Sequence, residues 1–255
     1  LGAAYSATGK PTQARAALEE AIKLNPNSAE VANNLGAVYS GERNTAKAIE
    51  YFEQAVRLLP QNPSYLTNLG QEYSRAGQIS KALPTLHSAL ELAPKSSVVA
   101  FALGAAFASA NSLDSAEYYF DQSLQNGGSS LDLHYFQATV KSRLGKKDVA
   151  IKHYKTVLEM QPTHIGALQS LGLLYFDQKR YIEAIEEFGR VTKVDSTYWA
   201  GWIGLGAAYS LADMLPQADT VLKRLFAIDS AMGFQMLDIV GKEYTRRKEA
   251  KESGQ

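Results

Sequence analysis

The sequence predicts an all-α fold in which helical hairpins of 34 residues stack next to one another. Three observations support this prediction. The hexapeptide LGAAYS occurs at residues 1–6 and again at residues 205–210, and the offset of 204 residues is six times 34. An alanine recurs every 34 residues, and a Leu-Gly pair and an aromatic residue keep constant distances from it. Several residue classes that stay in phase over seven copies indicate a genuine internal repeat.

The repeated residues can be read directly from the chain. The alanines are Ala14, Ala48, Ala82, Ala116, Ala150, Ala184 and Ala218. The Leu-Gly pairs begin at Leu1, Leu35, Leu69, Leu103, Leu171 and Leu205. The aromatic residues three places after each glycine are Tyr5, Tyr39, Tyr73, Phe107, Tyr175 and Tyr209. The large residues four places after each alanine are Leu18, Phe52, Leu86, Phe120, Tyr154, Phe188 and Leu222.

Each repeat carries two stripes of apolar residues at helical spacing. With residue 29 as position 1, positions 4, 7, 8 and 11 share one face of a first helix, and positions 20, 24 and 27 share one face of a second. A small residue at position 8 lets the two backbones approach where the helices cross. A single hairpin cannot bury both stripes, so neighbouring hairpins must stack.

The spacing predicts the helices in order. We expect first helices at 1–8 (truncated), 29–41, 63–75, 97–110, 131–144, 165–177 and 199–211. We expect second helices at 12–24, 45–58, 79–92, 113–126, 147–160, 181–194 and 215–228.

The seventh repeat resembles a known family. Trp202, Leu205, Gly206, Tyr209 and Ala218 match the W-x₂-L-G-x₂-Y…A pattern of the tetratricopeptide repeat. The resemblance extends over nearly the whole chain and implies a right-handed superhelical solenoid of stacked 34-residue hairpins. The expected repeats span 1–28, which lacks its beginning, and then 29–62, 63–96, 97–130, 131–164, 165–198 and 199–232.

The two ends of the chain carry different signals. In 233–255, the apolar residues Phe234, Leu237 and Ile239 precede a charged stretch that starts at Lys242, which is typical of a capping helix followed by a charged tail. Leu1 falls partway through a helix. We therefore expect the chain to be a piece of a longer protein, with any targeting signal upstream.

The residue at position 15 should end each first helix. Gly77 and Gly145 tolerate the left-handed conformation that such an end requires. Arg43 and Lys179 occupy the same position, so we expect their turns to be built differently.

The fifth repeat departs from the pattern. Gln137, Ala138 and Lys141 replace the usual Leu, Gly and Tyr. The apolar stripe lies one position earlier, at Leu133, Phe136, Val140 and Leu144. Two explanations are open: this helix has drifted and rotated to bury its own stripe, or the chain bends between the fourth and fifth repeats.

The composition narrows the function classes. The chain has 26 basic and 26 acidic residues, so no net charge favours nucleic acid or an anionic membrane. It has no run of 18 apolar residues that could span a bilayer. It has no cysteine, which removes thiol catalysis, disulfides and thiolate metal sites and fits both the cytoplasm and the periplasm.

The sequence contains no recognisable catalytic arrangement. The four histidines are His87, His134, His153 and His164, and none is paired at i, i+4. His134 occupies a core position, so we expect it to be packed and hydrogen-bonded. Carboxylates such as Glu187 fall on second helices, where we expect a solvated outer face. We therefore expect no enzyme activity, no cofactor and no metal site.

The resemblance places a binding groove on positions 2, 5, 6, 9, 12 and 13 of the first helices. The candidate groove residues are Asn34, Asn68, Gln71, Arg75, Phe101, Tyr135, Phe136, Arg143, Leu173 and Phe176. Asn34 and Asn68 resemble the groove asparagines with which some family members hold an extended peptide backbone; the alternative is that both amides are only solvated.

Four of these candidates are aromatic and come from consecutive repeats: Phe101, Tyr135, Phe136 and Phe176. They should approach one another across the groove, unless a rotated fifth repeat buries Phe136. A cluster of exposed aromatics marks an interaction surface, so the expected partner is a protein or peptide with an apolar face.

Three functions fit these observations. The first is a scaffold that binds a peptide or helix of a partner protein in its groove. The second is the recognition arm of a larger enzyme, such as a transferase, whose catalytic domain lies outside this chain. The third is a structural subunit of a self-assembling complex. We favour the first.

Overall fold

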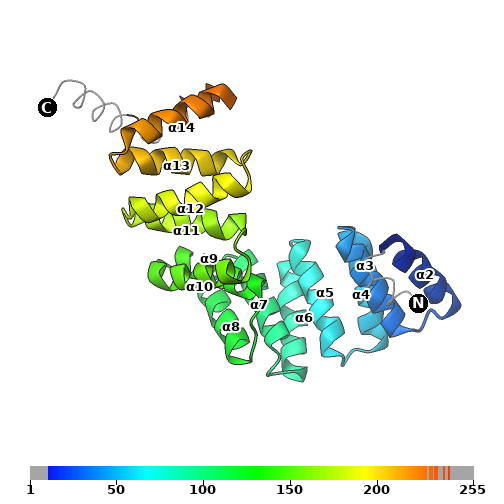
Figure 1. Ribbon diagram of the computed structural model, residues 1–255. Helices are drawn as coiled ribbons and strands as arrows, with labels where there is room; N and C mark the ends of the chain where they lie inside the picture. Colours follow the sequence, from blue (N-terminus) through cyan, green and yellow to red (C-terminus); the bar gives the residue numbers. More distant parts are fainter. Residues whose placement is uncertain (1–10, 229, 232, 235–237, 239–240, 242–255) are drawn as a thin grey trace, which may run out of the picture. The chain divides into compact units, whose positions relative to one another are not determined.

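A computed structural model describes residues 11–228, 230–231, 233–234, 238 and 241 (Figure 1). The chain divides into two compact units, residues 1–133 and residues 134–255. The described residues contain helices and no strand. The predicted all-α repeat fold is therefore confirmed. The first predicted helix and most of the C-terminal cap lie outside the described residues, and the division into seven repeats stays a prediction.

Seven of the labelled helices belong wholly to the N-terminal unit. They are α2 (Pro11–Leu24), α3 (Ala29–Gly41), α4 (Thr45–Leu58), α5 (Pro63–Arg75), α6 (Ile79–Leu92), α7 (Ser97–Ser109) and α8 (Leu113–Gln125). The C-terminal unit contains α9 (Leu131–Arg143), which begins at the boundary, and then α10 (Lys147–Met160), α11 (Ile165–Asp177), α12 (Tyr181–Val194), α13 (Trp199–Leu211) and α14 (Leu215–Ile228). Each predicted helix in this range has the predicted bounds to within one residue at either end.

Side chains at repeat-specific positions begin the helices. Ser28 and Ser96 accept a hydrogen bond from a backbone N–H in the first turn of α3 and α7, both at 3.3 Å. Asn62 does the same for α5, which has Pro63 at its first position. These caps satisfy backbone donors that have no partner inside the helix.

The first helices of the described repeats end in the same way. Arg43 and Lys179 have φ of 60° and 59°, close to the φ of 60° at Asn111, and Gly77 has φ of 72°. In each case the next backbone N–H returns to the carbonyl at position 11, as in the 2.8 Å bond from Gln78. This arrangement is a Schellman motif. The expectation that Arg43 and Lys179 build different turns is therefore wrong: the same local backbone hydrogen bonds close the turn around a residue that disfavours the left-handed conformation.

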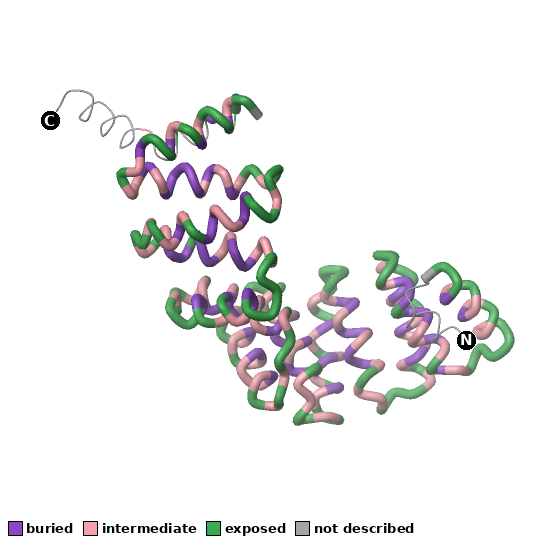
Figure 2. The backbone as a smooth tube through the Cα atoms, viewed as in Figure 1, coloured by how far each residue is buried: buried purple, intermediate pink, exposed green. Residues whose placement is uncertain are grey.

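Glycine at position 8 is required by close packing inside the hairpin. A Cβ atom built on Gly104 would lie 2.5 Å from the ring of Phe120, and one on Gly70 would lie 2.5 Å from Leu86. Both large side chains are fully buried. The Leu-Gly pair and the large residue four places after the alanine are thus two halves of one contact. Figure 2 shows the result, with buried residues on the sides of helices that face other helices.

The fifth repeat keeps the phase of the others. Gln137, Ala138 and Lys141 are buried, with exposed fractions of 1%, 0% and 7%, whereas Phe136 is 40% exposed. Of the two explanations, the rotation of this helix is therefore wrong, although Leu133 and Val140 of the shifted stripe are buried as well. The positions buried in α9 are the ones buried in the other described first helices, although two of the buried side chains in α9 are polar.

Candidate partner-binding groove

An apolar pocket of about 200 Å³ opens between α11 and α13, over the ring of Phe188 on α12. Its lining residues are Gln169, Leu173, Phe176, Phe188, Trp199, Ala200, Ile203, Gly204 and Ala207. Those on α11 and α13 stand at positions 1, 2, 5, 6, 9 and 12 of their repeats, nearly all of them positions expected to face the groove. The structure thus brings the two predicted residues Leu173 and Phe176 together in one pocket.

Large apolar side chains at this pocket are unusually exposed. Leu173 is 48% exposed and Trp199 is 45% exposed, although both are residue types that normally bury. Phe176 is half-buried and packs edge-on against Tyr181, with ring centroids 5.5 Å apart. Trp199 was not among the predicted groove residues, because it stands at position 1, outside the positions assigned to the groove.

The second tryptophan has a structural role. Trp202 donates a 3.0 Å hydrogen bond from Nε1 to the carbonyl of Ser196, and Arg224 lies over its ring at 4.3 Å. A tryptophan with its donor satisfied and its face covered is a packing residue. Trp199 is therefore the one of the two that faces the pocket.

The N-terminal unit contains a larger and more polar cavity of about 500 Å³. Gln71 and Phe101, both predicted, line it together with Val98 and the segment 127–130. Phe101 also packs against Phe120, with ring centroids 5.8 Å apart. This cavity joins positions 5 and 9 of consecutive first helices, as expected for a groove.

The two candidate groove asparagines differ in their contacts. Asn68 donates from Nδ2 to Oδ1 of Asn33 at 2.8 Å, whereas Asn34 is half-buried one position further along α3. Asn68 also lines a pocket of about 260 Å³ with Pro63 and Thr67. The amide link between neighbouring first helices therefore uses position 5 of one repeat and position 6 of the next.

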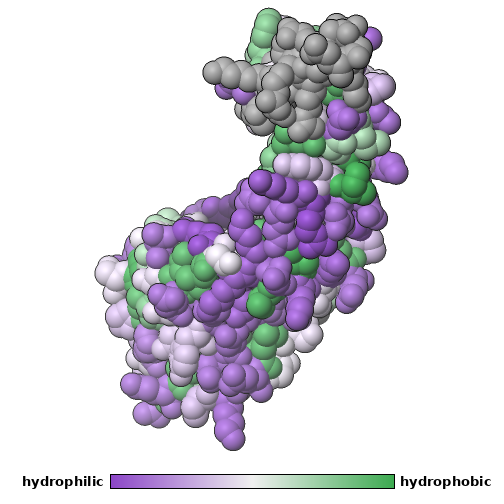
Figure 3. Space-filling view, turned by 90° about the vertical axis from the view of Figure 1, so that its left-hand side faces the viewer, coloured by the Kyte–Doolittle hydropathy of each residue, from purple (hydrophilic) through white to green (hydrophobic). Residues whose placement is uncertain are grey.

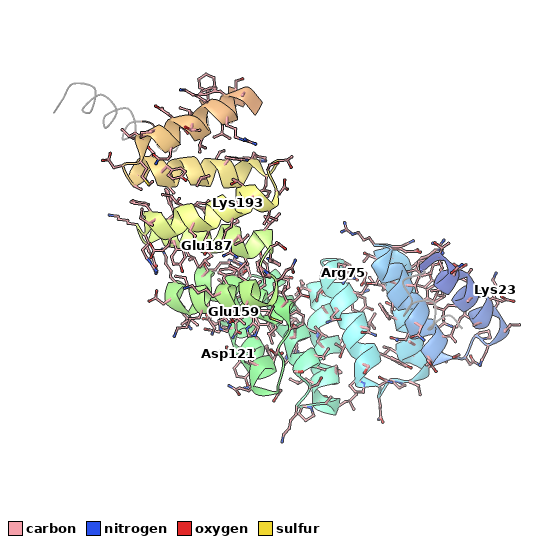
Figure 4. The ribbon with its side chains drawn as sticks, viewed as in Figure 1. Lys23, Arg75, Asp121, Glu159, Glu187 and Lys193 are labelled. Carbon is pink, nitrogen blue, oxygen red and sulfur yellow. The ribbon has the colours of Figure 1, made fainter. Side chains whose placement is uncertain are left out.

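Arg75 is held in place rather than left free in the groove. It lies in the last turn of α5 (Figure 4) and donates from Nη1 to both Ser40 and Glu72. The Ser40 hydroxyl donates to the Glu72 carboxylate at 2.7 Å, and Glu72 is 1% exposed. Arg143, the other predicted arginine, is exposed on α9.

The predicted aromatic cluster does not form within the C-terminal unit. Tyr135 lies against the start of α11: its hydroxyl would be 2.8 Å from a Cβ on Gly166, and its ring centroid is 4.9 Å from that of His164. Phe176 stands ten residues further along α11, a rise of about 15 Å. The two rings therefore occupy opposite ends of one helix. Phe136 packs edge-on against Tyr135, with ring centroids 6.0 Å apart.

The histidines make structural hydrogen bonds. His134 and His153 share a hydrogen bond of 3.2 Å between their Nδ1 atoms, and burial lowers the pKa of His134. The Nδ1 atom of His164 caps α11 by accepting from a backbone N–H at 3.0 Å. His87 donates to the carbonyl of Leu83 at 2.8 Å. Across the described part of the chain, no group of three or more His, Asp or Glu side chains is placed to hold a metal ion.

Glu187 corrects an expectation about the outer face. It is 8% exposed rather than solvated, and it accepts a 2.8 Å hydrogen bond from Arg190. Burial raises the pKa of this carboxyl. Arg190 also donates to the carbonyl of Pro162 at 3.0 Å, so the pair tethers the loop before α11 to α12.

The surface is otherwise mixed. On the face drawn in Figure 3, hydrophobic side chains form separate patches among predominantly hydrophilic ones. No described helix combines the length and the apolar character needed to cross a bilayer.

Stacked helical hairpins joined by apolar faces, with open pockets between successive first helices, define a helical-repeat scaffold. The chain belongs to the tetratricopeptide repeat family. The family model, described as tetratricopeptide repeat, matches residues 1–63, 67–130 and 136–198. This architecture is consistent with a protein–protein interaction scaffold.

Curated relatives match short parts of the chain. TPR repeat-containing protein MJ0941 of Methanocaldococcus jannaschii is 40% identical over 60 residues, which are 24% of this chain and 18% of that protein. The general transcriptional corepressor trfA of Dictyostelium discoideum is 30% identical over 81 residues, 32% of this chain and 6% of that protein. The chain thus matches less than a fifth of the length of either relative.

Solved structures share the fold at low identity. The APC/C hetero-tetramer Cut9-Hcn1 gives a TM-score of 0.74 at 18% identity over 81% of this chain and 41% of that one. The type IV pilus biogenesis factor PilW gives 0.69 at 16% identity over 78% and 92%. YrrB, a TPR protein with an unusual peptide-binding site, gives 0.63 at 19% identity over 78% and 97%.

Proposed function

We propose that the chain is a non-catalytic scaffold that binds an apolar segment, a peptide or a helix, of a partner protein in the groove of its first helices. The observation that carries this proposal is the pocket between α11 and α13. There Leu173, Phe176, Trp199 and Ile203 line a space that is open to a partner.

The physical argument rests on the cost of exposed apolar surface. Side chains of leucine and tryptophan are stabilised by burial, at about 25 cal/mol per Å² of apolar area removed from water. Leu173 and Trp199 leave nearly half of their surface in water, so covering them with a partner side chain is favourable. Aromatic anchors in such pockets supply a large share of binding energy in protein interfaces.

The wider groove supports the same function. Gln71 and Phe101 line the 500 Å³ cavity of the N-terminal unit, so a second pocket lies between first helices. YrrB shares the fold and has a peptide-binding site, which supports the proposal that this chain binds a peptide as well.

The test is capture of partners from cell extract with two matched charge variants. Leu173→Asp places a carboxylate in the pocket, whereas Ile182→Asp places one on α12, where Ile182 is 65% exposed and does not line the pocket. We expect the first variant to lose the partners of the natural chain and the second to keep them. Circular dichroism should show both variants folded. Retention of every partner by Leu173→Asp contradicts the proposal.

A further inference from the structure

One residue in the wall of the pocket between α11 and α13 carries a buried polar atom without a hydrogen-bond partner. Gln169 lines the pocket, and its Oε1 atom is shielded from solvent and accepts no hydrogen bond. We propose that this pocket receives the indole ring of a partner tryptophan, whose N–H donates to Gln169 Oε1. The inference rests on the proposed function, because it names the side chain that the apolar pocket selects.

The unpaired Gln169 Oε1 atom would be stabilised by a hydrogen-bond donor from a ligand. Buried polar atoms in native proteins nearly always have a hydrogen-bond partner, and each exception asks for an explanation. The amide of glutamine turns about a broad, two-fold terminal torsion, so Oε1 can rotate toward the pocket when a ligand enters. A ligand that brings a single N–H therefore satisfies an atom that the free protein leaves unpaired.

The other residues that line the pocket are apolar, so they favour a donor that is carried by an apolar ring. Leu173, Phe176 and Phe188 surround the space, so a charged lysine or arginine would lose its hydration without compensation. A volume of about 200 Å³ exceeds the roughly 150 Å³ of a protein cavity that holds benzene, and it therefore admits a larger ring.

Tryptophan alone combines these properties without an unmatched group. Its indole is a large apolar body with one donor and no acceptor. Phenylalanine and leucine leave Oε1 unpaired, and the tyrosine hydroxyl brings an acceptor that an apolar wall cannot satisfy. A backbone N–H stays at the mouth of the pocket with the main chain, whereas Oε1 is part of the shielded wall.

The test compares indole with 1-methylindole, which has the same ring system but no N–H. The chain has two tryptophans, so the Trp199 side-chain signal in ¹H–¹⁵N NMR reports on the pocket and the Trp202 signal serves as an internal reference. We expect indole to bind the natural chain at least about fivefold more tightly, because a site with a hydrogen-bonding group discriminates against an analogue that lacks it.

A matched pair of variants assigns the preference to one atom. Gln169→Leu leaves an apolar side chain of similar size but removes the acceptor, so the affinity ratio should fall to about one while 1-methylindole still binds. Gln217→Leu makes the same change at an exposed position on α14 outside the pocket and should keep the ratio. Equal affinities in the natural chain, or an unchanged ratio in Gln169→Leu, overturn the inference.

The experiments distinguish failure of the tryptophan assignment from failure of the proposed scaffold function. If both compounds bind equally and Leu173→Asp abolishes both, the apolar pocket stands and the tryptophan assignment is overturned. If neither compound perturbs Trp199, the assignment is likewise overturned, and the capture experiment decides the scaffold function independently.

Discussion

The hydroxyl of Tyr73 donates a 2.6 Å hydrogen bond to the Glu53 carboxylate, and one repeat earlier Tyr39 donates the equivalent bond to Glu19. In both cases the tyrosine at position 11 of a first helix reaches back to the second helix of the preceding repeat. Lys81 lies over the ring of Tyr73 at 5.2 Å. The tyrosine at position 11 therefore joins two repeats, because its hydroxyl bonds to the preceding repeat while the ring of Tyr73 contacts a lysine of its own repeat.

The tyrosine–carboxylate bonds predict a loss of stability in alkaline solution. The hydrogen bond to Glu19, with burial, raises the pKa of Tyr39 to about 12, and burial with the bond to Glu53 raises the pKa of Tyr73 to about 12. Between pH 10 and pH 12 the folded chain then holds protons that the unfolded chain has released. Below pH 10 the two tyrosines make their full contribution to the free energy of unfolding. This contribution falls as pH rises from 10 to 12, by up to about 1.4 kcal/mol per pH unit for each tyrosine.

The measurement is urea unfolding between pH 9 and pH 11.5. The double variant Tyr39→Phe with Tyr73→Phe should lose about 1–3 kcal/mol per bond at neutral pH and should show a shallower alkaline decline. An alkaline decline as steep in the variant as in the natural chain contradicts the assignment to these two hydroxyls.

Replacement of Lys179 by glycine should stabilise the chain. The φ of 59° is disfavoured for lysine and open to glycine, so Lys179→Gly should raise the free energy of unfolding by about 0.5–1 kcal/mol. The reverse change, Gly77→Ala, should lower it by about 1 kcal/mol, because a Cβ there meets no other atom and only the backbone conformation suffers. Equal denaturation midpoints for both variants and the natural chain would argue against strain at position 15.

A methyl group at position 8 should disrupt a hairpin. In Gly104→Ala the new Cβ would lie 2.5 Å from Phe120, which is fully buried and cannot move aside, so we expect a loss of about 1–3 kcal/mol. Gly189→Ala is the control, because a Cβ there meets nothing within 4 Å and should gain up to about 1 kcal/mol of helix propensity. Hydrogen exchange should localise the loss to α7 and α8. A neutral Gly104→Ala would show that this crossing is looser than the structure indicates.

The histidine pair predicts a loss of stability in acid. Burial lowers the pKa of His134 below its ordinary value of 6.5. At a pH below 6.5, the unfolded chain therefore binds a proton at this histidine more readily than the folded chain does. Stability is therefore unaffected above pH 6.5 and declines as pH falls below it. Thermal unfolding from pH 7.5 to pH 5 should show a smaller decline in His134→Gln, and an identical decline would exclude His134 as its source.

The sequence by itself determined the hairpins. Their helix bounds follow from apolar stripes with a 34-residue period, and the contact between Gly104 and Phe120 could be expected because both residues recur at fixed positions. Such features depend on residues close in the chain or one repeat away. A periodic pattern records these neighbours directly.

Only the tertiary structure decided the features in which neighbours overrule local preference. The phase of α9 around buried Gln137 and the pairing of Asn68 with Asn33 escape the local pattern. The pocket depends on how α11 and α13 are spaced over Phe188, which exposes Trp199 and leaves Gln169 Oε1 unpaired. Distances between side chains on different helices set these outcomes, and a one-dimensional pattern contains the residues but not those distances.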